Sequence, residues 1–284
     1  MLIGGIEAGG TKFVCAIGNR DGEVFDKISL PTVEPEETFQ TVKQFFDTYQ
    51  FGALGVGSFG PVDLDTKSDT YGTILNTPKT KWKHYDLLGK LKADFSVPVY
   101  LDTDVNAACL GEYLYGAGRD TDSTLYITVG TGIGAGFVHH GRTYQGKNHP
   151  EMGHIFVQKL ENDQFAGSCP YHGDCLEGLA SGTAIEQRYG LHGNLLQDDE
   201  RVWELEAYYL AQAIVNYAMI LSPERIILGG GVMKQERLYG MIREKVWELV
   251  NDYVAVGDVD ELIVAPELAD EQGVKGAMAL VEER

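Results

Sequence analysis

The segment from Glu7 to Lys12 (EAGGTK) combines residue types that could bind a phosphate group. The adjacent Gly9 and Gly10 leave main-chain N–H groups accessible, and the Thr11 hydroxyl adds a further donor. The carboxylate of Glu7, at the end of a predicted strand, could hold Mg²⁺ through water. The spacing is not that of a Walker loop. Because Gly-Gly is also a common turn, a hairpin without a ligand is the alternative interpretation.

Two more glycine clusters flank short apolar runs. In Thr128–Gly136 (TVGTGIGAG), alternate glycines leave one face of a strand without side chains, so a polyphosphate could lie against the main chain around Thr131 and Gly132. The spacing differs from that of a dinucleotide-binding fingerprint. The other cluster runs from Gly229 to Gly231. Glycine loops in both halves of the chain favour nucleotide binding over two unrelated turns.

The segment DTDVN places Asp102, Asp104 and Asn106 within one turn, where a short apolar strand is predicted to meet a helix. An Asp at a helix start is most often only a cap, and this is the alternative interpretation. Two acids and an amide in one turn could instead bind a polyol and accept a proton from it. Phosphoryl transfer needs positioning, a base and charge neutralisation, and the segments above provide all three.

His154, Cys169, His172 and Cys175 supply four nitrogen and sulfur donors of the kind that Zn²⁺ prefers. Three of them form a Cys-x₂-His-x₂-Cys loop, and four protein ligands predict a closed, structural zinc site. A coincidental cluster is the alternative. The zinc would fix the loops that carry Glu151 and Glu177, two carboxylates that could accept hydrogen bonds from sugar hydroxyls. Solvated surface acids are the simpler interpretation of that pair.

The composition describes an ordinary globular protein, with 44% hydrophobic and 23% charged residues. Its net charge of −19 would repel nucleic acids and anionic lipids, so we expect neither as a partner. A nucleotide is compatible with this charge, because N–H groups and Mg²⁺ can hold the phosphates. No apolar run approaches the roughly 20 residues that span a bilayer, and the N-terminus lacks a basic signal region. These features indicate a cytoplasmic protein.

The pattern of apolar residues predicts two α/β lobes that carry these segments. We expect strands over residues 2–6, 12–17, 27–29, 55–57 and 97–101, and helices over 36–49, 105–115, 200–221 and 272–283. The two meanders at 2–30 and 123–145 indicate a duplicated fold. The small lobe is predicted to span 1–117 plus about 272–284, and the large lobe, with the zinc loop, 118–271. At 284 residues, two lobes are favoured over one core.

With all four motifs in this order, the sequence resembles the ROK family (repressor, open reading frame, kinase) from Ile3 to about Leu280, and within it the bacterial zinc-containing fructokinases. The resemblance implies a duplicated ribonuclease-H-like (actin-like ATPase) α/β fold, with ATP and a hexose in the cleft between two lobes. It also implies a homodimer, Mg²⁺ and a structural Zn²⁺.

The resemblance assigns roles to residues of this chain. Asp104 is in the place of the catalytic base. Sugar contacts fall on Gly60, Pro61, Asn106, Glu151, His154 and Glu177. Nucleotide contacts fall on Gly9, Gly10, Thr11, Lys12, Thr131, Gly132, Gly229, Gly230 and Gly231. The zinc ligands are His154, Cys169, His172 and Cys175, and Mg²⁺ lies near Glu7.

Some positions differ from the common pattern of the family. Glu7 stands where Asp is usual, Thr103 where Asn is usual, and the Cys-x₂-His-x₂-Cys spacing replaces a longer cysteine motif. With Trp82 after Pro78-Lys79, these variants are closer to fructokinases than to glucokinases. The resemblance therefore predicts phosphorylation of D-fructose to fructose 6-phosphate, with glucose, mannose or N-acetylmannosamine as alternative substrates.

A sugar-responsive transcriptional regulator is a second alternative, because the family contains repressors with the same core. Such repressors carry an N-terminal helix-turn-helix. Here the predicted phosphate hairpin begins by residue 4 and the charge is acidic, both of which disfavour that alternative.

Overall fold

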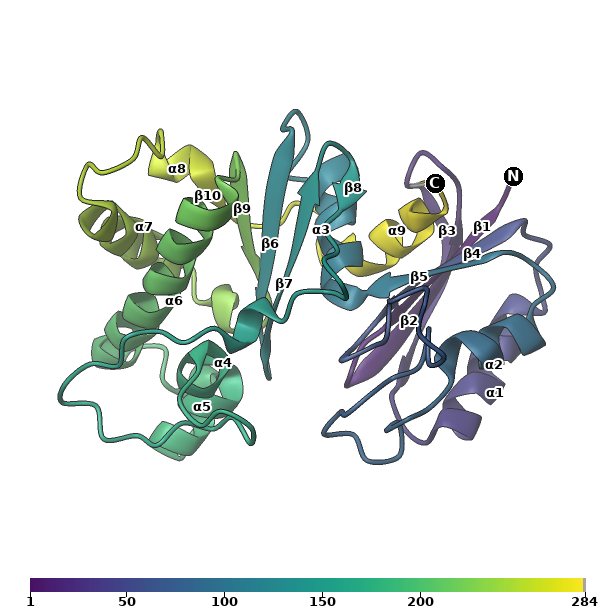
Figure 1. The fold of residues 1–284 in the computed structure, drawn as a ribbon, viewed down its shortest axis with the longest axis horizontal. Helices are drawn as coiled ribbons and strands as arrows, with labels where there is room; N and C mark the ends of the chain where they lie inside the picture. The colour runs from purple at the N-terminus through teal and green to yellow at the C-terminus, as the bar shows by residue number, and fades with distance from the viewer. Residues whose placement is uncertain (283–284) are drawn as a thin grey trace. The chain divides into compact units, whose positions relative to one another are not determined.

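The computed structural model describes residues 1–282, which form two compact units (Figure 1). The first unit contains residues 1–122, 136–150 and 267–282. The second unit contains residues 123–135 and 151–266. The strands form two five-stranded sheets, and each unit contains several helices.

The sheet of the first unit has the strand order β3-β2-β1-β4-β5. These strands are β1 (Ile3–Ala8), β2 (Lys12–Gly18), β3 (Val24–Pro31), β4 (Ala53–Ser58) and β5 (Val99–Thr103). The first three are antiparallel, whereas β1, β4 and β5 run parallel. The carboxyl ends of these three parallel strands therefore lie at one edge of the sheet, which is where ligands bind in open α/β sheets.

Alternate residues of these strands face different helices. Ile6 and Val56 belong to an apolar core with residues of α1 (Pro35–Phe46) and α2 (Leu87–Asp94). Glycine fills the positions that face the C-terminal helix, since a Cβ at Gly55 would lie 1.7 Å from the carbonyl oxygen of Ala277. Glycine is therefore required for the helix to approach the sheet.

The C-terminal helix α9 (Gln272–Ala279) also packs against α3 (Asp104–Tyr115), which follows β5, and is continued by the 3₁₀ turn η4 (Leu280–Glu282). The C-terminal segment therefore packs on the sheet and helices of the first unit.

The second sheet has the order β10-β9-β6-β7-β8. It contains β6 (Ser123–Val129), β7 (Ile133–His139), β8 (Arg142–Thr143), β9 (Arg225–Gly229) and β10 (Ile263–Val264). The two sheets have the same plan. Each begins with a hairpin, β1-β2 in the first sheet and β6-β7 in the second. Two parallel strands then extend each sheet on the other side, β4 and β5 beside β1, and β9 and β10 beside β6. The duplicated α/β fold that the sequence predicted is therefore confirmed.

Helices of the second unit lie beside its strands (Figure 1). They are α4 (Leu176–Ala180), α5 (Gly182–Tyr189), α6 (Glu200–Leu221), α7 (Arg237–Val250) and α8 (Val259–Leu262), with 3₁₀ turns η1 (Met152–His154), η2 (Gly193–Leu195) and η3 (Val232–Lys234). Helix α6 has the bounds predicted from its apolar pattern and packs on α7 and α4. It ends at Ser222, which is left-handed (φ 47°) and precedes a proline.

Two boundaries differ from those predicted. Helix α1 ends at Phe46 rather than at 49. The segment 136–150 belongs to the first unit, although the sequence favoured placing it in the second lobe. The reason lies in the side chains of Thr143 and Gln145, which donate hydrogen bonds to Asp102 of the first unit. No helix within residues 1–282 is both long enough and apolar enough to span a bilayer.

Candidate active site

Asp104 is the first residue of α3, at the junction with the end of β5. The sequence suggested Asp102 or Asp104 as the helix cap. The structure shows that Thr103 is the cap, because its extended backbone lets the Oγ1 atom accept a 3.1 Å hydrogen bond from the N–H of Asn106. The Asp104 carboxylate accepts a 2.9 Å bond from the adjacent Val105 N–H. It is therefore not the group that satisfies the end of the helix.

Asp102 is only 2% exposed and accepts four hydrogen bonds. Two come from its own turn, namely the Thr103 N–H at 2.6 Å and the Asn106 side-chain amide at 2.8 Å. The other two come from Thr143 (2.7 Å) and Gln145 (3.2 Å). Burial raises the pKa of Asp102, and the four hydrogen bonds oppose that rise. This carboxylate fixes the start of α3 to the segment 143–145.

The Gly60–Pro61 turn, whose peptide bond is cis, follows the end of β4. Just after it, the N–H of Val62 donates to His149 Nε2 at 3.2 Å. Two residues further on, the N–H of Leu64 donates to Asn148 Oδ1 at 3.0 Å. The segment 143–149 therefore binds both the predicted sugar turn and the predicted catalytic turn.

Four polar residues of this network, Thr143, Gln145, Asn148 and His149, were missed by the sequence analysis. Each lies close in sequence to the other three, but their partners lie between 41 and 87 residues away. The one available signal was the polar run TYQGKNH after a short strand, and nothing in that run indicates its partners.

The first glycine hairpin joins β1 to β2. The N–H of Gly9 donates to the Lys12 carbonyl at 3.0 Å, and a Cβ at Gly9 would lie 2.8 Å from that oxygen. Glycine is thus required there by the turn. Gly10 differs, because a Cβ at this position would meet only the Lys79 side chain, at an ordinary contact distance of 3.5 Å. The fold does not require Gly10, whereas the close approach of a ligand would.

Glu7 lies one residue before the end of β1, and its side chain reaches α9. A Cβ at Gly273 would lie 2.4 Å from the Glu7 carboxyl carbon, so the absence of a side chain there makes room for it. Burial raises the pKa of Glu7, the Lys12 ammonium lowers it, and the Asp270 carboxylate raises it.

The second glycine loop opens on a cavity of about 530 Å³ that lies entirely within the second unit. Its walls include Gly130, Thr131, Gly182, Thr183, Gly231 and Lys234. A Cβ at Gly130 or Gly231 would meet no atom within 4 Å, and the backbone of Gly231 is right-handed helical (φ −64°, ψ −33°). Both glycines leave the cavity wall without side chains, although the fold does not require glycine at either position. The Gly130 N–H itself is paired, because it donates to the Gly132 carbonyl at 2.9 Å.

The amino end of α5 forms one wall of this cavity. Ser181 caps the helix through a 3.1 Å bond from the Ala184 N–H. The Gly182 N–H donates to the Gly130 carbonyl at 2.7 Å, and the Thr183 hydroxyl to the Thr131 carbonyl at 2.7 Å. A helix start beside uncovered main chain is suited to phosphate groups.

Some predicted nucleotide residues line this cavity and others do not. Thr131 and Gly231 line it, whereas Gly132, Gly229 and Gly230 are not among its lining residues. Gly230 is left-handed (φ 92°), so the turn itself explains that glycine. The sequence analysis missed the contribution of Gly182 and Thr183, whose only local signal was the Ser-Gly-Thr start of α5.

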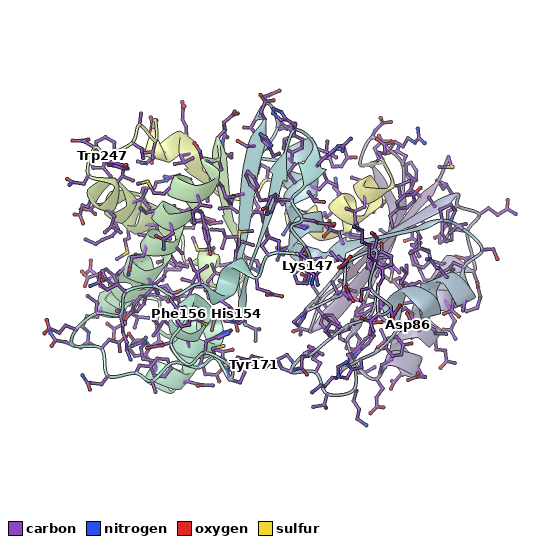
Figure 2. All side chains as sticks on the ribbon, in the orientation of Figure 1. Asp86, Lys147, His154, Phe156, Tyr171 and Trp247 are labelled. Atoms are coloured by element: carbon purple, nitrogen blue, oxygen red, sulfur yellow. The ribbon has the colours of Figure 1, made fainter. Side chains whose placement is uncertain are left out.

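The four predicted zinc ligands lie together, with their donor atoms all within 4.8 Å of one another. His154 Nδ1 is 3.5 Å from Cys175 Sγ and 3.7 Å from Cys169 Sγ, and His172 Nδ1 is 3.7 Å from Cys169 Sγ. Tetrahedral Zn²⁺ with ordinary bond lengths separates nitrogen and sulfur ligands by about 3.6 Å. The donor set therefore fits a tetrahedral metal. Phe156 and Tyr171 stand close to this cluster (Figure 2).

Glu177, at the start of α4, connects the metal cluster to the second glycine loop. Its Oε2 accepts a 3.0 Å bond from the Ile133 N–H, and its Oε1 lies 3.9 Å from His154 Nε2. Because the other nitrogen of His154 faces the two cysteines, Glu177 occupies the place of a carboxylate that orients a metal-bound histidine.

The loop from Glu151 to Cys175, which includes η1 and leads into α4, is fastened to α6. The Tyr217 hydroxyl donates to the Met152 carbonyl. The side-chain amide of Gln212 accepts from the main-chain N–H of Gln158 at 2.8 Å and donates to the Gln158 carbonyl at 3.0 Å. This loop carries Glu151 and His154, so helix α6 holds both predicted sugar-contact residues in addition to the metal cluster.

The comparisons with known proteins agree with these motifs. The sequence profile of the ROK family matches residues 3–284, and the chain belongs to this family. A relative from Bacillus subtilis (strain 168) is 50% identical over 99% of this chain and 96% of its own. The fructokinase of Pediococcus pentosaceus is 44% identical over 99% of this chain and 98% of its own.

Among solved structures, the ROK hexokinase from Thermus thermophilus superposes with a TM-score of 0.82 at 26% identity, covering 99% of this chain and 97% of its own. The fold that the sequence resemblance implied is therefore confirmed.

Proposed function

We propose that this protein transfers the γ-phosphoryl group of ATP to the 6-hydroxyl group of D-fructose. The observation that carries the proposal is the cavity of the second unit, where Gly130 and Gly231 leave the wall without side chains although the fold requires glycine at neither position. A bound polyphosphate explains both glycines. Fructose is favoured because the Pediococcus pentosaceus fructokinase matches the chain over nearly its full length.

In this proposal Asp104 is the general base. As the sugar oxygen forms a bond to the γ-phosphorus, the bond from that phosphorus to the β,γ-bridging oxygen breaks, and ADP leaves with the electron pair. The proton of the hydroxyl passes to the Asp104 carboxylate. The location of Asp104 supports this role, since Thr103 caps α3 and Asp102 makes the buried hydrogen bonds.

The phosphates are proposed to lie against main-chain N–H groups of both glycine loops, which neutralise developing charge. The residues proposed to contact the nucleotide are Gly9, Gly10, Thr11, Lys12, Thr131, Gly132, Gly229, Gly230 and Gly231. The sugar is proposed to contact Gly60, Pro61, Asn106, Glu151, His154 and Glu177. The hydrogen bonds that hold Asn106 and the 60–61 turn in place support the sugar set.

Two metals belong to the proposal. The four-residue cluster would hold a structural Zn²⁺, which braces the loop of Glu151 and Glu177. Glu7 would hold Mg²⁺ through water, and the ion would neutralise phosphate charge. Because the reaction consumes ATP, we place it in the cytoplasm. The homodimer implied by the family resemblance stays a prediction, to be tested by sedimentation.

A coupled ADP-release assay with MgATP and fructose, glucose, mannose or N-acetylmannosamine tests the proposal. We expect the highest kcat/KM with fructose. A general hexokinase is the second candidate, favoured by the similarity to the Thermus thermophilus enzyme, and it predicts comparable kcat/KM values for several hexoses. ADP release that no sugar stimulates would refute both.

A further inference from the structure

The turn that carries Lys79 is anchored in the core by the side chain of Trp82. Trp82, which ends the turn, is 1% exposed, and its indole N–H donates to the Val33 carbonyl at 2.7 Å. Its ring lies against Phe13 (5.4 Å between centroids), which follows Lys12, and against Phe59 (5.7 Å), which precedes the Gly60–Pro61 turn. The backbone of Lys79 is tied to this anchor, since its carbonyl accepts the Trp82 N–H at 2.9 Å.

Lys79 extends from this turn over the first glycine hairpin. Its Cε atom is 3.5 Å from the position that a Cβ of Gly10 would occupy. Apart from Gly10 and its two chain neighbours, no other atom of the described residues lies within 4 Å of that position. The ammonium is one bond beyond Cε. Because the fold does not require Gly10, the uncovered main chain there and the lysine together form a surface suited to an anion.

Lys79 is half-buried, and none of the ion pairs among residues 1–282 involves it. Lys81, two residues away and exposed, pairs with Glu34 at 3.1 Å. The Lys79 ammonium is therefore available to an anionic ligand at this surface.

We infer that Lys79 is a further catalytic residue, whose ammonium contacts the phosphoryl group during its transfer. This inference rests on the proposed kinase function. Charge on the three equatorial oxygens of that group changes as the bond to the sugar oxygen forms and the bond to ADP breaks, and a positioned cation stabilises it. Lys79 donates hydrogen bonds and keeps its proton, while the proton of the hydroxyl goes to Asp104.

The test compares Lys79→Met and Lys79→Arg with Lys81→Met in the same turn, using the full-length protein with fructose and MgATP. Loss of one such donor should lower kcat by about 10²–10³-fold. We expect that loss in Lys79→Met, a smaller loss in Lys79→Arg, and wild-type kcat in Lys81→Met. Thermal unfolding of all three should match wild type. Lys79→Ala should regain activity with added ethylammonium, which a purely structural role would not produce.

A Lys79→Met variant with near-normal kcat would overturn the inference. So would a raised fructose KM with unchanged kcat, which would assign Lys79 to sugar binding instead. If the wild-type protein released no ADP with any sugar, the proposed kinase function would fail. That result is distinct from failure of the inference alone, in which the wild-type protein is active and Lys79→Met keeps the wild-type kcat.

Discussion

The side-chain amide of Asn106 donates a 2.8 Å hydrogen bond to the carboxylate of Asp102, inside a buried set of four donors that converge on this one group. In an Asp102→Asn variant an amide NH₂ group replaces one of the two carboxylate oxygens. That group cannot accept a hydrogen bond, so some of the four donors lose their acceptor. We expect Asp102→Asn to lower the free energy of unfolding by about 1–3 kcal/mol. Because Thr143 would lose its acceptor, the sugar KM should rise. Urea denaturation and initial-rate kinetics measure both effects.

Asp104→Asn is the informative comparison for this first prediction. It removes the proposed base while leaving the capping bond of Thr103, so kcat should fall by about 10²–10⁴-fold with ATP binding and unfolding unchanged. Equal stability losses in both variants, or near-normal turnover in Asp104→Asn, would contradict the different roles assigned to the two carboxylates.

Gly231→Ala should weaken ATP binding without weakening the fold. The φ of −64° and ψ of −33° suit alanine, and its Cβ would meet no protein atom within 4 Å, so only the proposed phosphate would be displaced. We expect the KM for ATP to rise at least about tenfold, since lost phosphate hydrogen bonds are worth 1–3 kcal/mol each. Calorimetric titration with ATP and thermal unfolding measure the two quantities.

Gly240→Ala is the matched control for Gly231→Ala. Gly240 lies within α7, and a Cβ there also meets nothing within 4 Å. Alanine in a helix interior is about 0.5–1 kcal/mol more stable than glycine, so this variant should keep the KM for ATP and gain stability. Unchanged ATP binding in Gly231→Ala would show that phosphate does not lie against this glycine.

The sequence was sufficient to predict the parts of the site that depend on neighbouring residues. The Cys-x₂-His-x₂-Cys loop and the DTDVN turn carry their donors within seven residues or fewer, so residue type and spacing alone indicated the chemistry. His154 lies outside that loop in the sequence. It was predicted as a ligand because a tetrahedral zinc site needs a fourth donor, and in the structure it lies with the other three.

The polar residues of the segment 143–149 could not be predicted in the same way. Asp102 and Gln145 lie 43 residues apart, and Val62 and His149 lie 87 apart. Such pairs are formed by tertiary packing, for which a single sequence carries no local signal. The same cause explains the misplaced boundary, since the strand pattern continues through Gly136 while the contacts of the segment change units.

The metal cluster should be structural. Chelation or Cys169→Ser should remove the metal, lower the midpoint of thermal unfolding and reduce activity, because the ion fixes the loop that carries Glu151 and His154. Elemental analysis of the purified protein should find one zinc per chain. Cys109→Ala changes a cysteine outside the cluster and should keep the zinc. Full thermal stability after verified metal removal would refute a structural site.

Glu206 should make stability depend on pH. Its side chain is buried within α6, and one carboxylate oxygen is without a hydrogen-bond partner among the described residues. Burial raises the pKa of Glu206 well above 4.5, and the Arg188 guanidinium opposes that rise only partly. The folded protein therefore binds more protons than the unfolded chain between pH 4.5 and the raised pKa.

Within that pH window the free energy of unfolding falls as the pH rises, because the carboxyl group ionises in the unfolded chain while the buried one keeps its proton. Glu206→Gln keeps the shape of the side chain and removes the charge. Its stability should be nearest to that of wild type near pH 5 and should exceed it increasingly toward pH 8, because only wild type loses stability as the pH rises above 4.5. Urea denaturation of both proteins at pH 5, 6.5 and 8 measures the difference, in which the titration of all other groups cancels. A difference between the two proteins that does not change with pH would show that Glu206 ionises in the folded protein as it does in the unfolded chain.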